Sequence, residues 1–113
     1  MGVRHVRAAE IPRDRSAIEG EGFTATFGEV IAAAASPAAW HHHGGHHIVA
    51  YLIDGKVRVE FGADGSDTVV LEPGDMVHIE PNTIHRERYV GDVKLVGFSV
   101  GEGPGRVDVD QPA

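Results

Sequence analysis

The sequence predicts an all-β domain, an antiparallel sandwich or barrel. Short apolar stretches recur along the chain and are separated by turn residues at intervals of about 8–12 residues, a spacing typical of this class. Glycine makes up 15 of the 113 residues, which indicates many turns, and no amphipathic helix of convincing length is visible. We expect residues 1–113 to form a single domain, because the chain has the length of one domain and contains no linker or internal repeat.

Seven segments are expected to be strands because they are apolar or alternate apolar with polar residues, and end at turn residues. They are residues 23–35, 46–53, 56–61, 68–71, 76–79, 85–90 and 93–100. In the first, the alanine run at 32–35 lies too close to Gly28 and Pro37 for a long helix. The second ends at Asp54-Gly55, a dipeptide typical of two-residue hairpins.

The third segment carries the strongest strand signal, since Val57, Val59 and Phe61 alternate with polar residues and share one face. The later segments are separated by turns expected at residues 62–67, 72–75, 81–83 and 91–92. The tail at 101–113 is rich in Gly, Pro and Asp, so we expect it to be loosely held. The core is therefore expected at about residues 20–100.

The composition excludes several classes of protein. Hydrophobic residues are 42% and charged residues 24%, a globular profile, and the net charge of -7 disfavours nucleic acid and anionic membranes as partners. There are no cysteines, which excludes disulfides and thiolate metal sites. The N-terminal sequence has no apolar signal region and no apolar run could span a bilayer, so we expect a cytoplasmic protein.

The histidines are the main chemical feature. Five of the eight lie between Trp40 and Ile48. In an extended chain His41, His43 and His47 would share a face, and the other two of this group would point elsewhere. A bend at Gly44-Gly45 would break that phase for His47. Neutral imidazole is a common ligand of transition metals, so the pattern indicates a metal site; the alternative is a solvated loop that binds Ni or Zn adventitiously.

A further histidine, His85, favours the metal site. A turn, a short strand and a second turn bring it to the start of the strand expected at 85–90. Both histidine regions resemble the two characteristic motifs of the cupin superfamily, which are small jelly-roll β-barrels. His41-His42-His43 matches the His-x-His of the first motif and Gly55 its closing glycine. The second motif runs from Gly74 to His85, and the resemblance covers about residues 36–89.

The sequence departs from the family pattern at several positions. Ala35 replaces the opening glycine of the first motif, and Glu80 and Asn82 replace the Pro and Gly of the second. The acidic ligand of the first motif is missing, because His47 or Ile48 stands in its place, depending on the spacing used.

The resemblance nevertheless implies one divalent transition-metal ion (Fe, Ni, Mn, Zn or Cu). Its expected ligands are His41, His43, His47 and His85, or the set without His47 if that side chain points away. Either set leaves coordination positions open to water or substrate, as in catalytic rather than structural metal sites.

Two further residues are candidates for catalysis. Glu87 is in phase with His85 on one strand, where a desolvated carboxylate could act as general acid or base; the alternative is an ion pair with Arg86, Arg88 or Lys94. Tyr51 is in phase with His47, and we expect it either to line the cavity or to belong to the core.

The resemblance implies a metal-dependent enzyme that acts on a small organic substrate. One form is an oxidoreductase, a dioxygenase of the diketone or flavonol type; another is a polyketide cyclase or isomerase. The alternative is a non-enzymatic module that binds a small molecule or a metal. By analogy with the family, we also expect a homodimer.

Overall fold

The computed structural model describes residues 2–3, 5, 7, 17–31 and 37–112. Its strands are β1 (Ala17–Gly20), β2 (Phe23–Ile31), β3 (His41–His42), β4 (His47–Phe61), β5 (Asp67–Leu71), β6 (Met76–Ile79), β7 (His85–Val100) and β8 (Val107–Asp108). One short 3-10 turn, η3 (Ala63–Gly65), is the helical element among the described residues. No described helix has the length and apolar character needed to cross a membrane.

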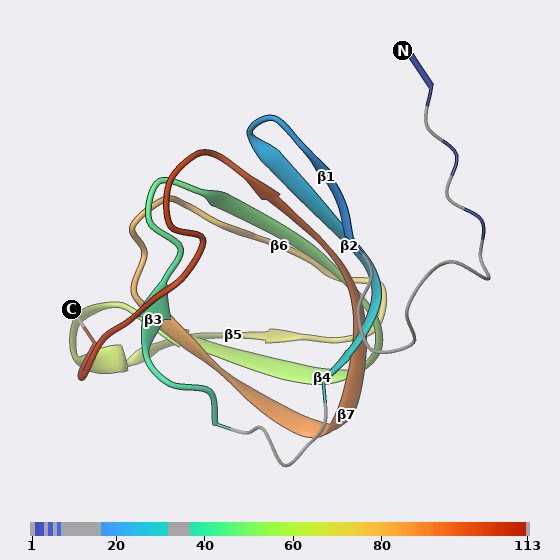
Figure 1. Ribbon diagram of the computed structural model, residues 1–113. Coiled ribbons are helices and arrows are strands. Elements are labelled where there is room, and N and C mark those ends of the chain that lie inside the picture. The colour runs from blue at the N-terminus through green and yellow to red at the C-terminus, as the bar shows by residue number, and fades with distance from the viewer. Residues whose placement is uncertain (1, 4, 6, 8–16, 32–36, 113) are drawn as a thin grey trace.

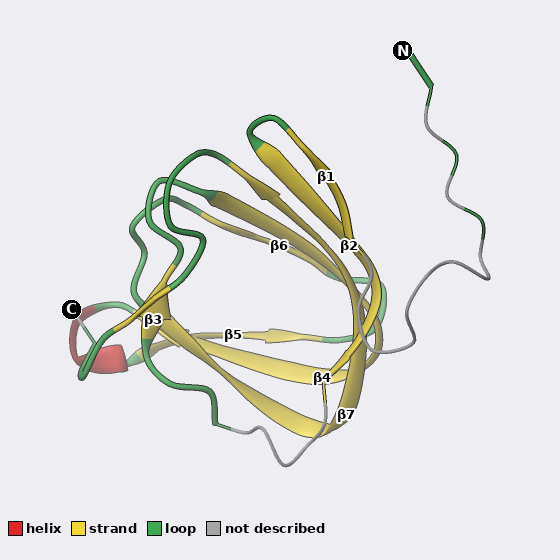
Figure 2. Ribbon diagram, viewed as in Figure 1, coloured by secondary structure: helices red, strands yellow, loops and turns green. Residues whose placement is uncertain are grey.

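All strand pairings are antiparallel and belong to one sheet. The long strands β4 and β7 pair along most of their length, β2 pairs with β7 and β1 with β2, while β5 and β6 both pair with β4. Figure 1 shows this sheet curling into an open half-barrel, and Figure 2 shows its long loops gathered at one end. The prediction of an all-β antiparallel barrel is confirmed.

The two central strands are longer than the sequence predicted. The expected hairpin at 54–55 and the expected turn at 91–92 are both wrong, because these dipeptides lie inside β4 and β7. The register slips on both sides of Asp54, and Gly55 and Gly91 have positive φ angles of 90° and 73°. Glycine with positive φ suits a β-bulge as well as a turn. The two facing irregularities therefore lie within the paired strands instead of ending them.

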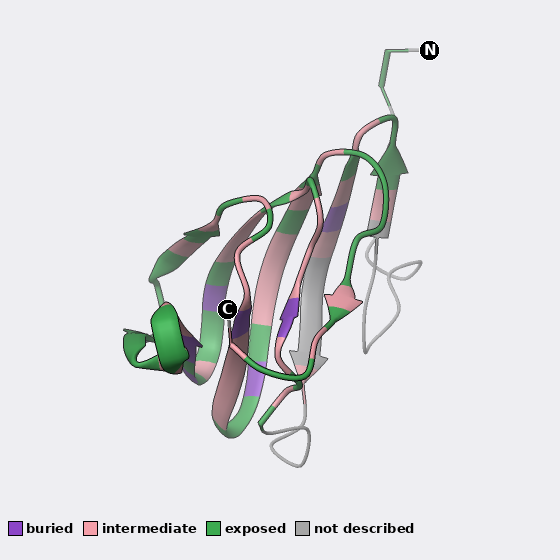
Figure 3. Ribbon diagram, turned by 90° about the vertical axis from the view of Figure 1, so that its left-hand side faces the viewer, coloured by how far each residue is buried: buried purple, intermediate pink, exposed green. Residues whose placement is uncertain are grey.

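This bulge reverses which side chains face inward along β4. Before it, Ile48 and Leu52 line the concave side; after it, Val57 and Val59 do. The buried core consists of Leu52, Val57, Val59, Leu71 and Val93. Figure 3 shows that the buried positions, drawn in purple, are few and are spread over several strands of the sheet.

The C-terminal segment, expected to be loose, makes defined contacts. We call residues 101–112 the C-terminal strap. Within it, β8 pairs with β3, and the Val109 amide donates a hydrogen bond of 2.9 Å to the Trp40 carbonyl. In Figure 1 the strap, drawn in red, runs along the same side of the molecule as β3. Composition alone could not show this, because the partner of β8 is a two-residue strand about 65 positions earlier in the chain.

Candidate metal centre

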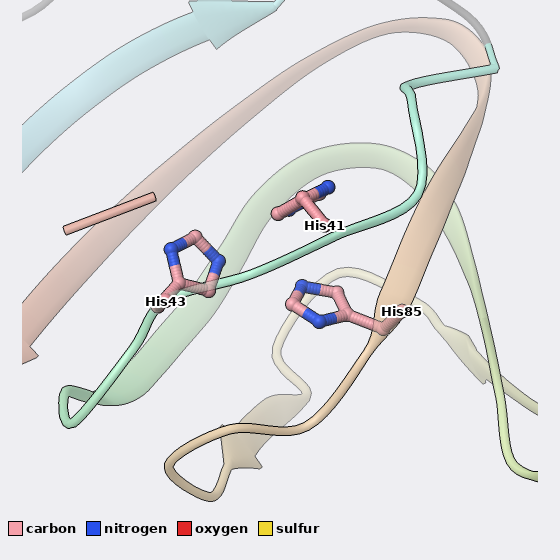
Figure 4. A group of neighbouring side chains, drawn as sticks. All are labelled: His41, His43 and His85. Carbon is pink, nitrogen blue, oxygen red and sulfur yellow. The ribbon is translucent and has the colours of Figure 1, made fainter. Parts of the chain in front are cut away.

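Three of the predicted histidines form one cluster. His41 lies on β3, His43 follows it, and His85 begins β7; the pairing of β3 with β7 places His41 directly opposite His85. One potential ligand atom from each of the three imidazoles lies within 4.8 Å of the others. His41 and His85 are 1% and 0% exposed. Figure 4 shows the three rings facing one another, so this group could hold a metal ion.

Each of these rings is held by a backbone carbonyl. The Nδ1 atoms of His41, His43 and His85 lie 2.7, 2.7 and 2.9 Å from the carbonyl oxygens of Ala39, Gly105 and Thr83. A carbonyl only accepts, so Nδ1 carries the proton and donates, which leaves the Nε2 lone pair free in the neutral ring. Metal-binding histidines commonly have this arrangement, in which the outer nitrogen is fixed by a hydrogen bond.

The inner nitrogen of His85 lacks a hydrogen bond. Its Nε2 atom is buried and has no hydrogen-bond partner among the described residues, although Glu87 Oε1 lies 3.2 Å away. That contact is close enough for an ion pair but is not aligned as a hydrogen bond. A buried polar atom without a partner is uncommon and calls for an explanation such as an ion. The donor set of the cluster therefore fits a transition metal.

Glu87 faces the cluster, as its phase with His85 predicted. Its Oε1 atom lies 3.2 Å from Nε2 of His85 and 3.6 Å from Nε2 of His41, and its side chain is 18% exposed. Burial alone would raise the pKa of Glu87, but its contacts with His41 and His85 and their positive charge outweigh burial and hold the pKa far below the usual range.

Two of the alternative partners of Glu87, Arg86 and Arg88, bind another carboxylate. Arg86 and Arg88 donate from Nε to Oε1 of Glu60, at 2.7 and 2.8 Å. Burial would raise the pKa of Glu60, but these two hydrogen bonds and charges lower it. The Arg86 guanidinium also lies 4.3 Å from the centre of the Trp40 ring. Alternate side chains of a strand face opposite sides, so Glu87 points toward the histidines while Arg86 and Arg88 point toward Glu60.

The pKa values of the clustered imidazoles move in opposite directions. Burial would lower the pKa of His41, but its contact with Glu87, its hydrogen bond to the Ala39 carbonyl and the charge of Glu87 raise it above 6.5. The pKa of His43 falls below 6.5 because of burial and the nearby His85 and His41, against the effect of its hydrogen bond to Gly105. As the pH rises, His43 therefore becomes neutral while His41 still carries its positive charge.

The structure places His47 away from the other three predicted ligands. The chain turns at Gly44, which has a φ of 56°, and the next inward side chain is that of His46. His47 is exposed on the outer face, where its Nδ1 lies 2.9 Å from Nε2 of His78. Strand phase placed His47 with His41 only if the chain stayed extended, and the Gly44-Gly45 turn shifts that phase by one residue.

Tyr51 shares the outer face with His47. It is 42% exposed and pairs with Met76 and Val96, so it neither lines the cavity nor belongs to the core. The sequence analysis placed Tyr51 on the same face of the strand as His47, and in the structure that shared face is the outer one. His46, which the sequence analysis left outside the site, lines the cavity instead; its Nε2 donates to the Gly103 carbonyl and its Nδ1 accepts from Ser99. Because both ring nitrogens are used, His46 is not available as a ligand.

A cavity of about 680 Å³ adjoins the cluster. Its walls are mainly apolar and include side chains from β4, β5, β6 and β7: Ile48, Ala50, Leu52, Val57, Val59, Leu71, Val77, Ile79 and Leu95. Its polar part includes His41, His43, Glu87 and Arg106. The sequence analysis missed Arg106; the only signal was a basic residue in a tail otherwise rich in Gly, Pro and Asp. A cavity of this size and character suits a small organic molecule.

The structure is thus a half-barrel of antiparallel strands with three inward histidines that could hold a metal ion. When the sequence is compared with models of protein families, the model of the cupin domain matches residues 18–101. The chain belongs to the cupin domain family. The match ends at the first residue of the C-terminal strap, so residues 102–112 of the strap lie outside the matched region. No curated protein matches the chain by sequence.

Solved structures show the same fold. The protein NMB1881 from Neisseria meningitidis superposes with a TM-score of 0.63 at 24% identity, over 77% of this chain and 83% of that one. Ectoine synthase from P. lautus gives 0.69 at 18%, over 100% and 93%. The Fe(II) form of HppE gives 0.67 at 16%, over 87% of this chain and 60% of that one. These likenesses support the fold.

Proposed function

We propose that this protein is a metal-dependent cupin enzyme that acts on a small organic molecule. Nε2 of His41, His43 and His85 would hold a divalent transition-metal ion. The observation that carries the proposal is the fixed orientation of three inward imidazoles, whose outer nitrogens all donate to backbone carbonyls. Such preorganisation is expected of a ligand set and is not needed for an ordinary buried histidine.

The chain's own residues suit a catalytic rather than a closed structural site. The ligand cluster borders a cavity instead of being covered by the core. When bound, the ion would supply Lewis acidity and, if redox-active, electrons for dioxygen chemistry. The apolar walls hold the body of a substrate and exclude water. The guanidinium of Arg106, 50% exposed at the side of the cavity, donates from Nε to Oδ1 of Asp108 at 2.9 Å, and its other N–H groups can contact a negatively charged group of that substrate.

Two reaction types are compatible with this site. One is dioxygen-dependent cleavage of a diketone or flavonol; the other is cyclisation or isomerisation of a polyketide-like molecule. The fold neighbours include the Fe(II) form of HppE, whose name is consistent with a metal-dependent reaction on this fold but does not say which one. A binding module without catalysis is the second candidate function, because a cavity beside a metal-ready cluster also suits recognition alone.

The test is turnover by protein prepared without a tag. Separate samples are loaded with Fe(II), Ni, Mn, Zn or Cu and given diketones, flavonols and linear polyketide analogues, while dioxygen uptake and product formation are followed. We expect turnover with at least one metal, absent in His41→Ala and retained in His47→Ala, whose side chain lies on the outer face. Saturable binding without any turnover would favour the binding module. Neither binding nor turnover with any loaded metal would contradict both.

A further inference from the structure

We infer that Glu87 is a fourth protein ligand of the metal, supplying from β7 the carboxylate that the first histidine motif lacks. This inference rests on the proposed metal centre and assigns a ligand that the motifs do not. It also replaces the role of general acid or base that the sequence predicted for this residue. The acidic position of the first motif is occupied by His47 or Ile48, and the structure places His47 on the outer face.

The distances within the site fit joint coordination. Oxygen and nitrogen ligands bind a transition-metal ion at about 2.1 Å, so two adjacent ligands lie about 3.0 Å apart in octahedral and about 3.4 Å apart in tetrahedral geometry. Oε1 of Glu87 lies 3.2 Å from Nε2 of His85 and 3.6 Å from Nε2 of His41. The carboxylate oxygen is therefore already near the separation that shared coordination requires, and it is close to the two most buried ligand nitrogens.

The backbone explains why Glu87 can reach this position. It lies two residues after His85 on β7, and alternate side chains of a strand share a face. His41 lies directly across from His85 in the register of β3 and β7. One strand therefore supplies an imidazole and a carboxylate to the site, and the strand beside it supplies the imidazole that faces both.

The charges in this region give a second reason. The side chain of Glu87 is largely buried, and a buried carboxylate needs a positive partner. The adjacent Arg86 and Arg88 are bound to Glu60. Imidazoles must be neutral to bind a metal, so in the loaded protein they cannot balance the charge of Glu87. A divalent cation among the three histidines would.

The test compares four variants with the natural sequence. Glu87→Gln keeps the shape and removes the charge, whereas Glu87→Asp keeps the charge and shortens the reach. Glu72→Gln is the matched control, since it removes one carboxylate that is 60% exposed and paired with Lys56. His41→Ala tests the centre itself. Zn(II) affinity is measured by competition with a chelator, ligand geometry from the absorption bands of the Co(II)-loaded protein, and folding by circular dichroism.

We expect both Glu87 variants to bind Zn(II) at least about tenfold more weakly and to change the Co(II) bands, since loss of even an outer-sphere partner costs about 10- to 100-fold in affinity. Glu72→Gln should match the natural sequence. Unchanged Co(II) bands in Glu87→Gln, or full affinity in Glu87→Asp, would overturn the inference, because only the charge would then matter. If His41→Ala also binds Zn(II) with full affinity, the proposed metal centre is contradicted together with the role of Glu87. If His41→Ala loses affinity, the metal centre stands and only the role of Glu87 as a ligand is contradicted.

Discussion

Backbone carbonyls determine which nitrogen each clustered histidine presents. For His41 and His85 the acceptor lies two residues earlier in the chain, at Ala39 and Thr83, so the same local geometry recurs before two different strands. For His43 the acceptor is Gly105 in the C-terminal strap. The rings are thus oriented without help from side-chain carboxylates, which leaves the nearby carboxylate of Glu87 to face the inner nitrogens.

In the metal-free protein, Glu87 and His41 should stabilise each other in a limited range of pH. The pKa of Glu87 is lowered, so its contribution is present above 4.5 and lost as the pH falls through its folded-state pKa. The pKa of His41 is raised, so its contribution is present below 6.5 and lost as the pH rises through its folded-state pKa.

We therefore predict that the metal-free protein becomes less stable toward urea as the pH is raised above 6.5. Glu87→Gln should show a smaller decrease, because it removes the main group that raises the pKa of His41. The measurement is the urea midpoint as a function of pH in the presence of a chelator. An equal decrease in both proteins would show that this pair does not control the pH dependence.

At the scale of elements, the facing irregularities of β4 and β7 carry a specific requirement for glycine. A Cβ atom at Gly55 would lie 2.6 Å from Cγ1 of Val93 and 2.7 Å from the Asp92 carbonyl, at a φ of +90°. We predict that Gly55→Ala lowers the free energy of unfolding by about 1–3 kcal/mol through overpacking, beyond any strain from the backbone angle. Urea unfolding measures this change.

Gly91→Ala is the matched control for that substitution. It has a φ of +73° and nothing within 4 Å of the added Cβ, so it introduces backbone strain without a clash. The difference between the two variants isolates the close contact with Val93 and Asp92. If Gly91→Ala costs as much as Gly55→Ala, the contact is unimportant and the backbone angle alone explains both.

The C-terminal strap is the second element with a testable role. Its Gly105 carbonyl orients His43, and a Cβ at Gly44 would lie 2.8 Å from the Pro104 carbonyl, so the strap lies directly against the histidine turn. We predict that a chain ending at Gly101 binds metal about 10- to 100-fold more weakly, as for other lost outer-sphere partners. Zn(II) competition titrations measure this loss.

The control for the strap is a double-mutant comparison. If the strap acts through His43, shortening the chain should weaken binding in the natural sequence but have little further effect in His43→Ala. Equal effects in both backgrounds would mean that the strap contributes elsewhere, for example through the pairing of β8 with β3.

At the scale of the whole molecule, the sequence was informative where its pattern was regular. Alternation at 56–61 and the recurring turns predicted an all-β fold, and motif spacing gave His41, His43 and His85, which the structure brings together. The predictions from sequence were wrong where glycine allows more than one backbone conformation. Gly55 lies in a β-bulge and not in a hairpin turn, and the turn at Gly44 places His47 on the outer face. The dimer stays a prediction.

The account depends most directly on one measurement, the metal content of protein prepared without a tag and determined by elemental analysis. We predict stoichiometric metal in the natural sequence, lost in His41→Ala and in His85→Ala. His47→Ala and His78→Ala should keep it, because that exposed pair lies on the outer face. Metal retained after loss of either His41 or His85, or lost with the outer pair, would contradict the proposed centre.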